Sequence, residues 1–150
     1  MFRGSSPITL DAKGRMAVPA KYRERLRDCS GGRLVVTVSR DPCLLIYPLP
    51  EWENVEARVQ ALSSMDPQVA RFKRLLLGRA EDLDMDGQGR VLIPARLREG
   101  VQLDRQVTLV GVVNKFELWA QDRWDALNAE SLDETLAGLE LPEELRSLSF

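Results

Sequence analysis

The sequence contains one block twice, and this duplication constrains the fold more strongly than any other feature. The block reads LDAKGRMAVPAKYR at residues 10–23 and MDGQGRVLIPARLR at residues 85–98, which is 75 positions later. Aspartate, glycine, arginine, proline, alanine and a final arginine occupy matching positions in both copies. Further on, residues 44–52 match residues 116–124 at an offset of 72, as expected if the second copy has a shorter connection. The chain is therefore predicted to contain two copies of one small module.

Each copy predicts the same order of secondary structure. The Asp-x-x-Gly-Arg stretch has the composition of a tight turn, and the proline after it suits the first turn of a helix. The predicted elements are strands at 16–18, 35–38 and 43–47 with a helix from Pro19 to Gly31, and strands at 91–93, 108–113 and 116–120 with a helix from Pro94 to Gly100. A β-α-β-β unit of roughly 45 residues is too small to bury a good core alone, so we expect one intertwined α+β, β-rich domain.

These boundaries divide the chain into four segments. Residues 1–50 form the first repeat and residues 80–125 the second. Residues 51–79 are predicted to be a helical connector, with one amphipathic helix and a second that begins at Asp66 and Pro67. Residues 126–150 are predicted to be an acidic tail, helical and flexible.

Composition excludes several classes of function. The chain has no histidine, which rules out Ser-His and Cys-His catalysis, and we expect no enzyme and no cofactor. The two cysteines, Cys29 and Cys43, are too few for a zinc-finger set and are expected to be small core residues. Residues 82–87 copy the start of a calcium-binding loop, but Ile93 stands where that loop needs glutamate, so we predict no metal site. No apolar run approaches the length of a membrane span, and a cytoplasmic protein is expected.

Charge is distributed unevenly although the whole chain carries only −2. Residues 1–40 hold nine lysines and arginines against three acids, a balance of +6. Residues 117–150 hold two arginines against nine acids, a balance of −7. A basic binding surface with an acidic remainder would show this polarity, and so would an ordinary solvated surface.

The repeated Asp-x-x-x-Arg motif supplies the candidate site. The planar fork of arginine can grip a phosphate or the edge of a guanine, and glycine before it lets the backbone approach a partner. The aspartate repels phosphate, so we expect it to pair with the arginine or to cap the turn. The alternative is that both pairs are structural ion pairs that close each hairpin. The residues given this local role are Asp11, Gly14, Asp86 and Gly89.

With this motif in two copies, the chain resembles the MraZ family of bacterial regulators, within the wider AbrB/MazE-like swapped-hairpin group. The resemblance covers nearly the whole chain. Its blocks are residues 1–4 (MFRG), 10–15 (LDAKGR), 42–44 (PCL), 47–52 (YPLPEW), 74–78 (RLLLG), 85–90 (MDGQGR) and 114–119 (NKFELW). It implies a swapped-hairpin barrel and a cytoplasmic, nucleoid-associated transcriptional regulator that binds short direct repeats in double-stranded DNA, upstream of the division and cell-wall gene cluster. It also implies a ring-like homo-oligomer.

The resemblance places DNA contacts in the loop and strand around the first motif. It assigns this role to Lys13 and Arg15, with Arg3 beside them. In the second copy Arg90 is retained, but Gln88 stands where the first copy has Lys13. From the helix that follows the first motif we add Lys21 and Arg23, although a charge run on a helix is usually a solvated face.

Two other functions remain open from the sequence. The first is an antitoxin-like protein that binds a toxin through its acidic tail, and the second is a scaffold without a nucleic-acid role. Trp52, Trp119 and Trp124 could stack on single-stranded bases, but their matching places in both repeats favour packing. No small-molecule substrate and no membrane partner is predicted.

Overall fold

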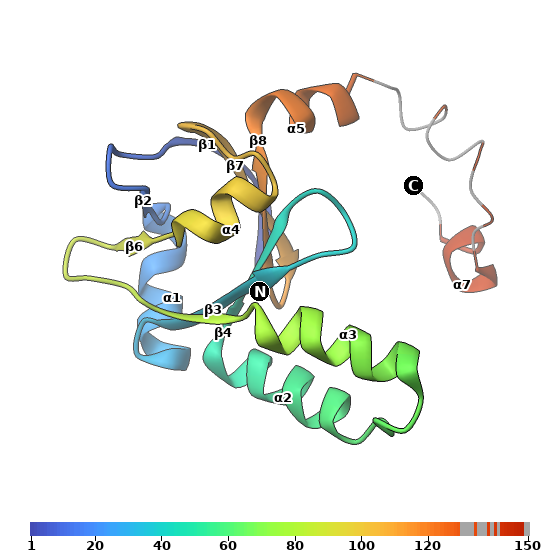
Figure 1. Cartoon of the computed structure of the whole chain (residues 1–150). Helices are drawn as coiled ribbons and strands as arrows, with labels where there is room; N and C mark the ends of the chain where they lie inside the picture. Colours follow the sequence, from blue (N-terminus) through green and yellow to red (C-terminus); the bar gives the residue numbers. More distant parts are fainter. Residues whose placement is uncertain (130–133, 135–137, 139, 141, 149–150) are drawn as a thin grey trace.

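The computed structural model describes residues 1–129, 134, 138, 140 and 142–148 as an α+β structure rich in antiparallel strands (Figure 1). The predicted α+β, β-rich class is confirmed. Much of the predicted tail lies outside the described residues. Before and within that tail the structure has α5, Gln121–Leu127, and α7, Glu143–Arg146. Each helix in the described part of the chain is too short or too polar to span a lipid bilayer.

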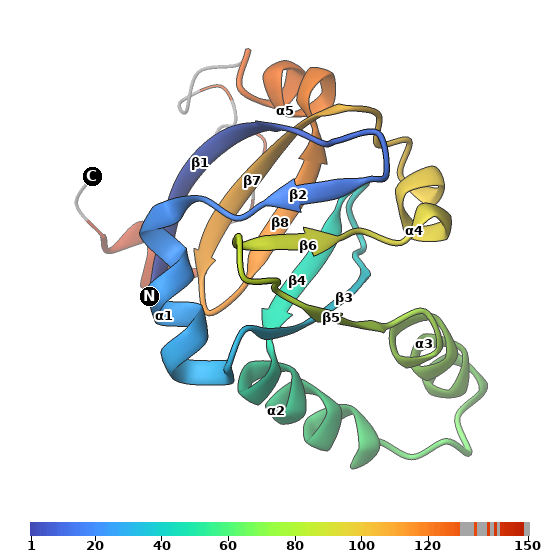
Figure 2. The same ribbon diagram turned by 90° about the vertical axis from the view of Figure 1, so that its left-hand side faces the viewer.

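Six strands form the main sheet in the order β1-β7-β8-β4-β3-β5, and all neighbours are antiparallel. Their bounds are β1 Phe2–Thr9, β3 Arg33–Val38, β4 Leu44–Pro48, β5 Glu81–Asp84, β7 Gln106–Val113 and β8 Phe116–Ala120. Two short strands, β2 at Arg15–Ala17 and β6 at Arg90–Leu92, form a separate antiparallel ribbon. Figure 2 shows β2 and β6 side by side, apart from the main sheet.

The two repeats exchange strands. The first strand of each repeat does not pair within its own repeat but joins the other one, so that β1 pairs with β7 and β5 pairs with β3. The ribbon also takes one strand from each repeat, and β4 pairs with β8 at the centre of the main sheet. Backbone hydrogen bonds therefore join strands of the two repeats in both the main sheet and the ribbon.

The predicted β-α-β-β unit was wrong in one respect, because a strand precedes the motif in each copy. The two strands that were not predicted are β1 and β5, so each unit is β-β-α-β-β. Their sequences, FRGSSPIT and EDLD, are polar or contain Gly and Pro, which are poor signals of strand structure. Both strands lie at the ends of the sheet order, where one flank needs no partner and proline is tolerated.

The helices follow the predicted order. The motif helices are α1, Ala20–Ser30, and α4, Ala95–Gly100, and each follows a proline at its N-cap. The connector helices are α2, Leu49–Gln60, which begins two residues before the predicted connector, and α3, Pro67–Gly78. Oδ1 of Asp66 accepts a hydrogen bond from the backbone N–H of Gln68 and so caps α3 as expected.

Apolar side chains pack on both faces of the main sheet. One face, with Leu34 and Val36 of β3, joins a large core that includes Leu26 of α1 and residues of the ribbon. The other face, with Val35, packs against Trp52 of α2. This alternation follows from the two-residue period of a strand. The ribbon and the motif helices thereby cover one face, and the connector helices cover the other (Figures 1 and 2).

Candidate nucleic-acid interface

The first motif forms a tight turn between β1 and β2, and Asp11 organises it. Its Oδ1 accepts hydrogen bonds from the backbone N–H groups of Lys13 and Arg15, both at 2.9 Å. Its Oδ2 accepts from Nε of Arg15 at 2.6 Å, which makes an ion pair. The Asp11 backbone closes the turn, because its N–H donates to the Arg15 carbonyl and its carbonyl accepts from the N–H of Gly14.

The second motif repeats this arrangement between β5 and β6. Oδ1 of Asp86 accepts from the backbone N–H groups of Gln88 and Arg90, both at 2.9 Å. Oδ2 of Asp86 accepts from Nε of Arg90 at 3.0 Å. The backbone bonds of Asp86 with Arg90 and Gly89 also match those of the first turn. The two turns therefore have one hydrogen-bond pattern.

These hydrogen bonds keep both aspartates ionised to low pH. The backbone N–H of Arg15, then its side chain and the N–H of Lys13, lower the pKa of Asp11 from 3.8 to about 2 against a smaller opposing effect of burial. The equivalent bonds, led by the backbone N–H of Arg90, lower the pKa of Asp86. Each aspartate is thus a fixed anion that holds its arginine beside the turn.

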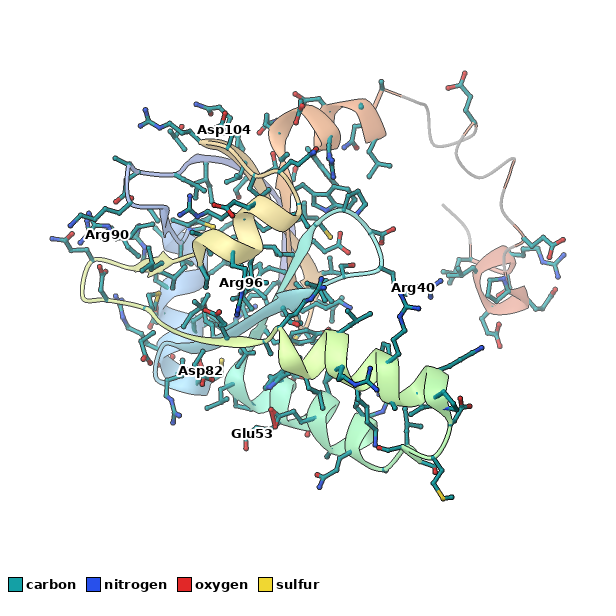
Figure 3. All side chains as sticks on the ribbon, in the orientation of Figure 1. Arg40, Glu53, Asp82, Arg90, Arg96 and Asp104 are labelled. Carbon is teal, nitrogen blue, oxygen red and sulfur yellow. The ribbon has the colours of Figure 1, made fainter. Side chains whose placement is uncertain are left out.

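The outer face of the ribbon carries both motif arginines. Across the ribbon, Arg15 pairs with Leu92 and Arg90 pairs with Ala17. The middle residues, Met16 and Val91, are buried, so the flanking side chains point outward by the alternation of a strand. Leu92 is 53% exposed. Figure 3 shows Arg90 directed away from the body of the molecule.

The chain matches known proteins over nearly its full length. A family model described as "MraZ protein, putative antitoxin-like" matches residues 1–75 and again residues 76–140. The chain belongs to the MraZ family. Two relatives named "Transcriptional regulator MraZ" are 49% identical in Pseudomonas fluorescens (strain SBW25) and 50% identical in Pseudomonas aeruginosa (strain LESB58). Each alignment covers 149 residues and 99% of both chains. The resemblance is confirmed, and the two family matches confirm the repeat.

In this MraZ chain the remaining predicted contact residues lie in different places. Lys13 is exposed at the tip of the first turn. Arg3 is exposed near the start of β1, so six strand positions, about 20 Å at the usual rise of a strand, separate it from Thr9 and the turn that follows. Lys21 lies over the ring of Tyr22, with Nζ 4.9 Å from the ring centroid. The structure therefore brings Lys13 and Arg15 together but not Arg3.

Arg23 is half-buried and does not belong to the first turn. Its Nε donates to the carbonyl of Val18 at 2.7 Å, and its side chain lies against Gly89 of the second turn. Arg98, at the matching position of α4, lies in the same way against Gly14 of the first turn. Each motif turn therefore contacts an arginine from the helix of the other repeat.

Two basic residues near the first turn were missed from the sequence. One is Arg98, and the other is Arg105, whose backbone carbonyl accepts a hydrogen bond from Leu10 and whose Nε donates to the Leu10 carbonyl. The repeat alignment pairs Arg98 with Arg23, which was a usable signal that it has an equivalent role. Nothing in the alignment shows which turn either arginine reaches, because that depends on how the repeats pack.

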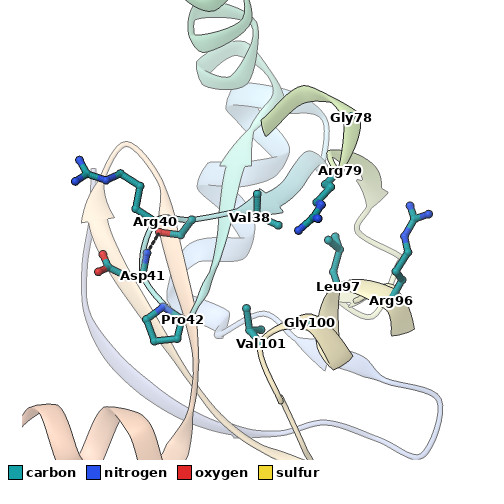
Figure 4. Close-up of a pocket in the computed structure, with 11 residues that line it drawn as sticks. Val38, Arg40, Asp41, Pro42, Gly78, Arg79, Arg96, Leu97, Gly100 and Val101 are labelled. Carbon is teal, nitrogen blue, oxygen red and sulfur yellow. Dashed lines mark hydrogen bonds between the residues drawn. The ribbon is translucent and has the colours of Figure 1, made fainter. Parts of the chain in front are cut away.

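A pocket of about 540 Å³ lies beside the β3–β4 loop, the end of α3, and α4 (Figure 4). Arg79 points into this pocket, whereas the guanidinium of Arg40 points away from it. Asp41 is the one carboxylate among the lining residues, and the remaining walls include Val38 and Leu97.

The tryptophans and Cys43 pack in the interior of the protein or against one another, whereas Cys29 does not. Trp52 and Trp119 are buried, and Trp119 packs on Trp124 with ring centroids 6.1 Å apart, so the predicted packing role is confirmed. Cys43 is also buried, and this burial raises the pKa of its thiol to about 12. Cys29 is exposed near the end of α1, so the prediction that both cysteines are core residues was wrong for it.

Proposed function

We propose that this chain is a transcriptional regulator that binds double-stranded DNA through the outer face of the β2–β6 ribbon and its two motif turns. The observation that carries the proposal is the display of Arg15 and Arg90 on one outward face, each oriented by an ion pair. The naming of relatives at 49% and 50% identity as transcriptional regulators supports it.

The dimensions of the ribbon suit a DNA groove. Three residues per strand span about 10 Å, and the major groove of B-DNA, about 12 Å wide, admits a two-stranded ribbon. Arginine can bond guanine or phosphate with its terminal nitrogens, since the ion pair with aspartate engages Nε in each turn. Exposed Leu92 offers an apolar contact of the kind that a thymine methyl accepts.

Lys13 increases the affinity of the first turn for DNA. It is exposed and its ammonium adds a positive charge beside Arg15, whereas Gln88 adds none beside Arg90. Neutralising phosphates releases counterions, and this release drives most of the sequence-independent affinity. We therefore assign the larger share of binding to the first turn, and Arg3, Lys21 and Arg23 remain secondary candidates.

We further propose that the chain forms a ring-like homo-oligomer on short direct repeats upstream of the division and cell-wall gene cluster. Several modest contacts on adjacent DNA repeats would add through effective concentration. The strand exchange between the repeats supports assignment to the AbrB/MazE-like swapped-hairpin barrels. A cytoplasmic, nucleoid-associated location follows from this function.

The test is fluorescence anisotropy with a duplex taken from upstream of the protein's own gene cluster. Wild type and Arg15→Ala would be titrated at low and physiological salt, beside a scrambled duplex of equal length. We expect binding that depends on the repeats, and a loss of about a hundredfold in Arg15→Ala at an unchanged oligomer size. Equal affinity for the scrambled duplex, or an Arg15→Ala protein that binds as well as wild type, would overturn the assignment.

The description "antitoxin-like" for the family favours one second candidate, a protein that binds a toxin partner. The acidic stretch after Glu117 would then face a basic partner. A toxin reading frame beside the gene, and capture of its product by wild type and by Arg15→Ala alike, would support this function.

A further inference from the structure

The first motif turn is held by a residue of the other repeat. A Cβ placed on Gly14 would lie 2.6 Å from Cζ and 2.7 Å from Nε of Arg98. The guanidinium of Arg98 therefore occupies the space that a side chain at position 14 would fill. The turn needs glycine for a second reason, because the backbone of Gly14 has φ +87°.

Arg98 is itself anchored to the short segment between β6 and its own helix. Its Nε donates to the carbonyl of Ile93 at 3.0 Å, and the N–H of Ile93 donates to the carbonyl of Gly14 at 3.1 Å. One short segment of the second repeat thus contacts Gly14 through its backbone and through the Arg98 side chain. Gly14 immediately precedes Arg15, whose guanidinium faces outward from the ribbon.

The second turn has the reciprocal arrangement. A Cβ on Gly89 would lie 2.6 Å from Cδ of Arg23, and Nε of Arg23 donates to the carbonyl of Val18. The N–H of Val18 in turn donates to the carbonyl of Gly89 at 2.8 Å. The same three contacts therefore occur twice: the arginine and the residue before the proline each contact the glycine of the other repeat, and the arginine donates to that residue within its own repeat.

We infer that Arg98 and Arg23 are positioning residues for DNA binding, each of which fixes the motif turn of the opposite repeat. This inference rests on the proposed function of the turns. Arg98 holds the first turn in the geometry that presents Arg15, and Arg23 does the same for Arg90. Each DNA-contacting end of the ribbon is thus built from both repeats.

Salt dependence separates positioning from direct contact. A side chain that neutralises one phosphate contributes about 0.9 to the slope of log affinity against log salt concentration. A positioning residue weakens binding at every salt concentration and leaves the slope unchanged. Arg98→Lys retains the charge but loses the planar group, so it should behave like Arg98→Met if the guanidinium positions the turn.

The experiment measures affinity for the upstream duplex in Arg98→Met, Arg15→Ala and the double variant. The matched control is Arg96→Met, on the same helix, whose side chain pairs with Glu81. We expect Arg98→Met to weaken binding about tenfold with an unchanged salt slope, and Arg96→Met to bind as wild type. In the Arg15→Ala background, Arg98→Met should cause no further loss, because it acts through that arginine.

Amide hydrogen exchange supplies a readout in the free protein. The N–H groups of Gly14 and Arg15, both bonded to Asp11, should exchange faster in Arg98→Lys and Arg98→Met, whereas those of Gly89 and Arg90 should not change. Arg23→Met should give the mirror-image result. General destabilisation would instead accelerate exchange in both turns alike.

The outcomes distinguish this inference from the proposed function. If Arg15→Ala weakens DNA binding but Arg98→Met and Arg98→Lys do not, the positioning role is overturned and the function stands. Equal losses from Arg98→Met with and without Arg15, or a reduced salt slope, would also overturn it. If Arg15→Ala binds as wild type, the proposed function itself fails.

Discussion

The two motif turns share one geometry but differ in the charge that they display. In each, an aspartate accepts two backbone hydrogen bonds and an ion pair from an arginine four residues later. In each, a glycine with positive φ contacts an arginine of the other repeat. At the exposed position just before the glycine, the first turn has Lys13 and the second has Gln88.

The residues that build each turn are distinct from the exposed residue before the glycine, to which we assign the difference in DNA affinity. Aspartate, glycine and arginine build the turn, and the exposed position contributes only its backbone N–H, which donates to the aspartate. A lysine or a glutamine can therefore occupy it without altering the fold. The duplication has retained the structural residues, and the turns differ in one exposed charge.

The largest expected difference between the turns is in their arginines. Arg15→Ala should weaken binding to the upstream duplex about a hundredfold, and Arg90→Ala only about tenfold, within the range expected for one arginine contact. The reason is that Lys13 draws phosphate to the first turn and the second turn lacks an equivalent. Anisotropy titrations of both variants under one buffer condition measure this. Equal losses would show that the turns contact DNA equivalently.

Alanine substitutions of the two turn glycines test whether the contacting arginines hold both turns equally tightly. Gly14→Ala and Gly89→Ala should each lower the free energy of unfolding by about 2–3 kcal/mol, because the new Cβ meets an arginine at a positive φ. Gly87→Ala is the control, since a Cβ there meets nothing within 4 Å, and it should change stability by less than about 0.5 kcal/mol. Urea denaturation gives these values. A Gly14→Ala protein as stable as the control would contradict the tight contact with Arg98.

Exchanging Lys13 and Gln88 for one another should change the DNA affinity of the two turns in opposite directions. Lys13→Gln should weaken DNA binding several-fold and reduce the salt slope by about 0.9, and Gln88→Lys should strengthen binding and raise the slope by a similar amount. Stability should not change in either variant. Salt titrations of DNA affinity test both, and an unchanged slope in Gln88→Lys would mean that the second turn does not face phosphate.

Low pH should destabilise the two turns because it protonates their aspartates. The folded-state pKa of Asp11 is about 2, below the 3.8 of an unperturbed carboxyl, so its ionised form stabilises the fold above about pH 4. That contribution is lost as pH falls from about 4 towards 2. Asp11→Asn should therefore destabilise the protein at pH 6 and have a smaller effect near pH 2.5, measured as the free energy of unfolding. Asp86→Asn should behave alike, and a pH-independent difference would contradict this account.

The local chemistry of the turns was predictable from the sequence because neighbouring residues make most of it. Asp11 and Arg15 are four positions apart, and short-range geometry determines that the carboxylate reaches both the backbone and the guanidinium. The start of the helix after each ribbon strand was predictable for the same reason, because a proline lies directly before it. The repeat itself, visible as matched residues, also indicated the MraZ family.

Which parts of the two repeats meet depends on long-range packing, which the local sequence does not specify. β1 and β5 are polar segments that form strands by pairing with the opposite repeat. Their own sequences therefore give little indication of strand structure. Arg23 and Arg98 read as charges on a helix, but packing directs each onto a glycine of the other motif. Such contacts join residues about 65 to 85 positions apart, and no local rule specifies them. Local sequence therefore accounts for each turn, and the packing of the two repeats accounts for the contacts that hold the turn in place.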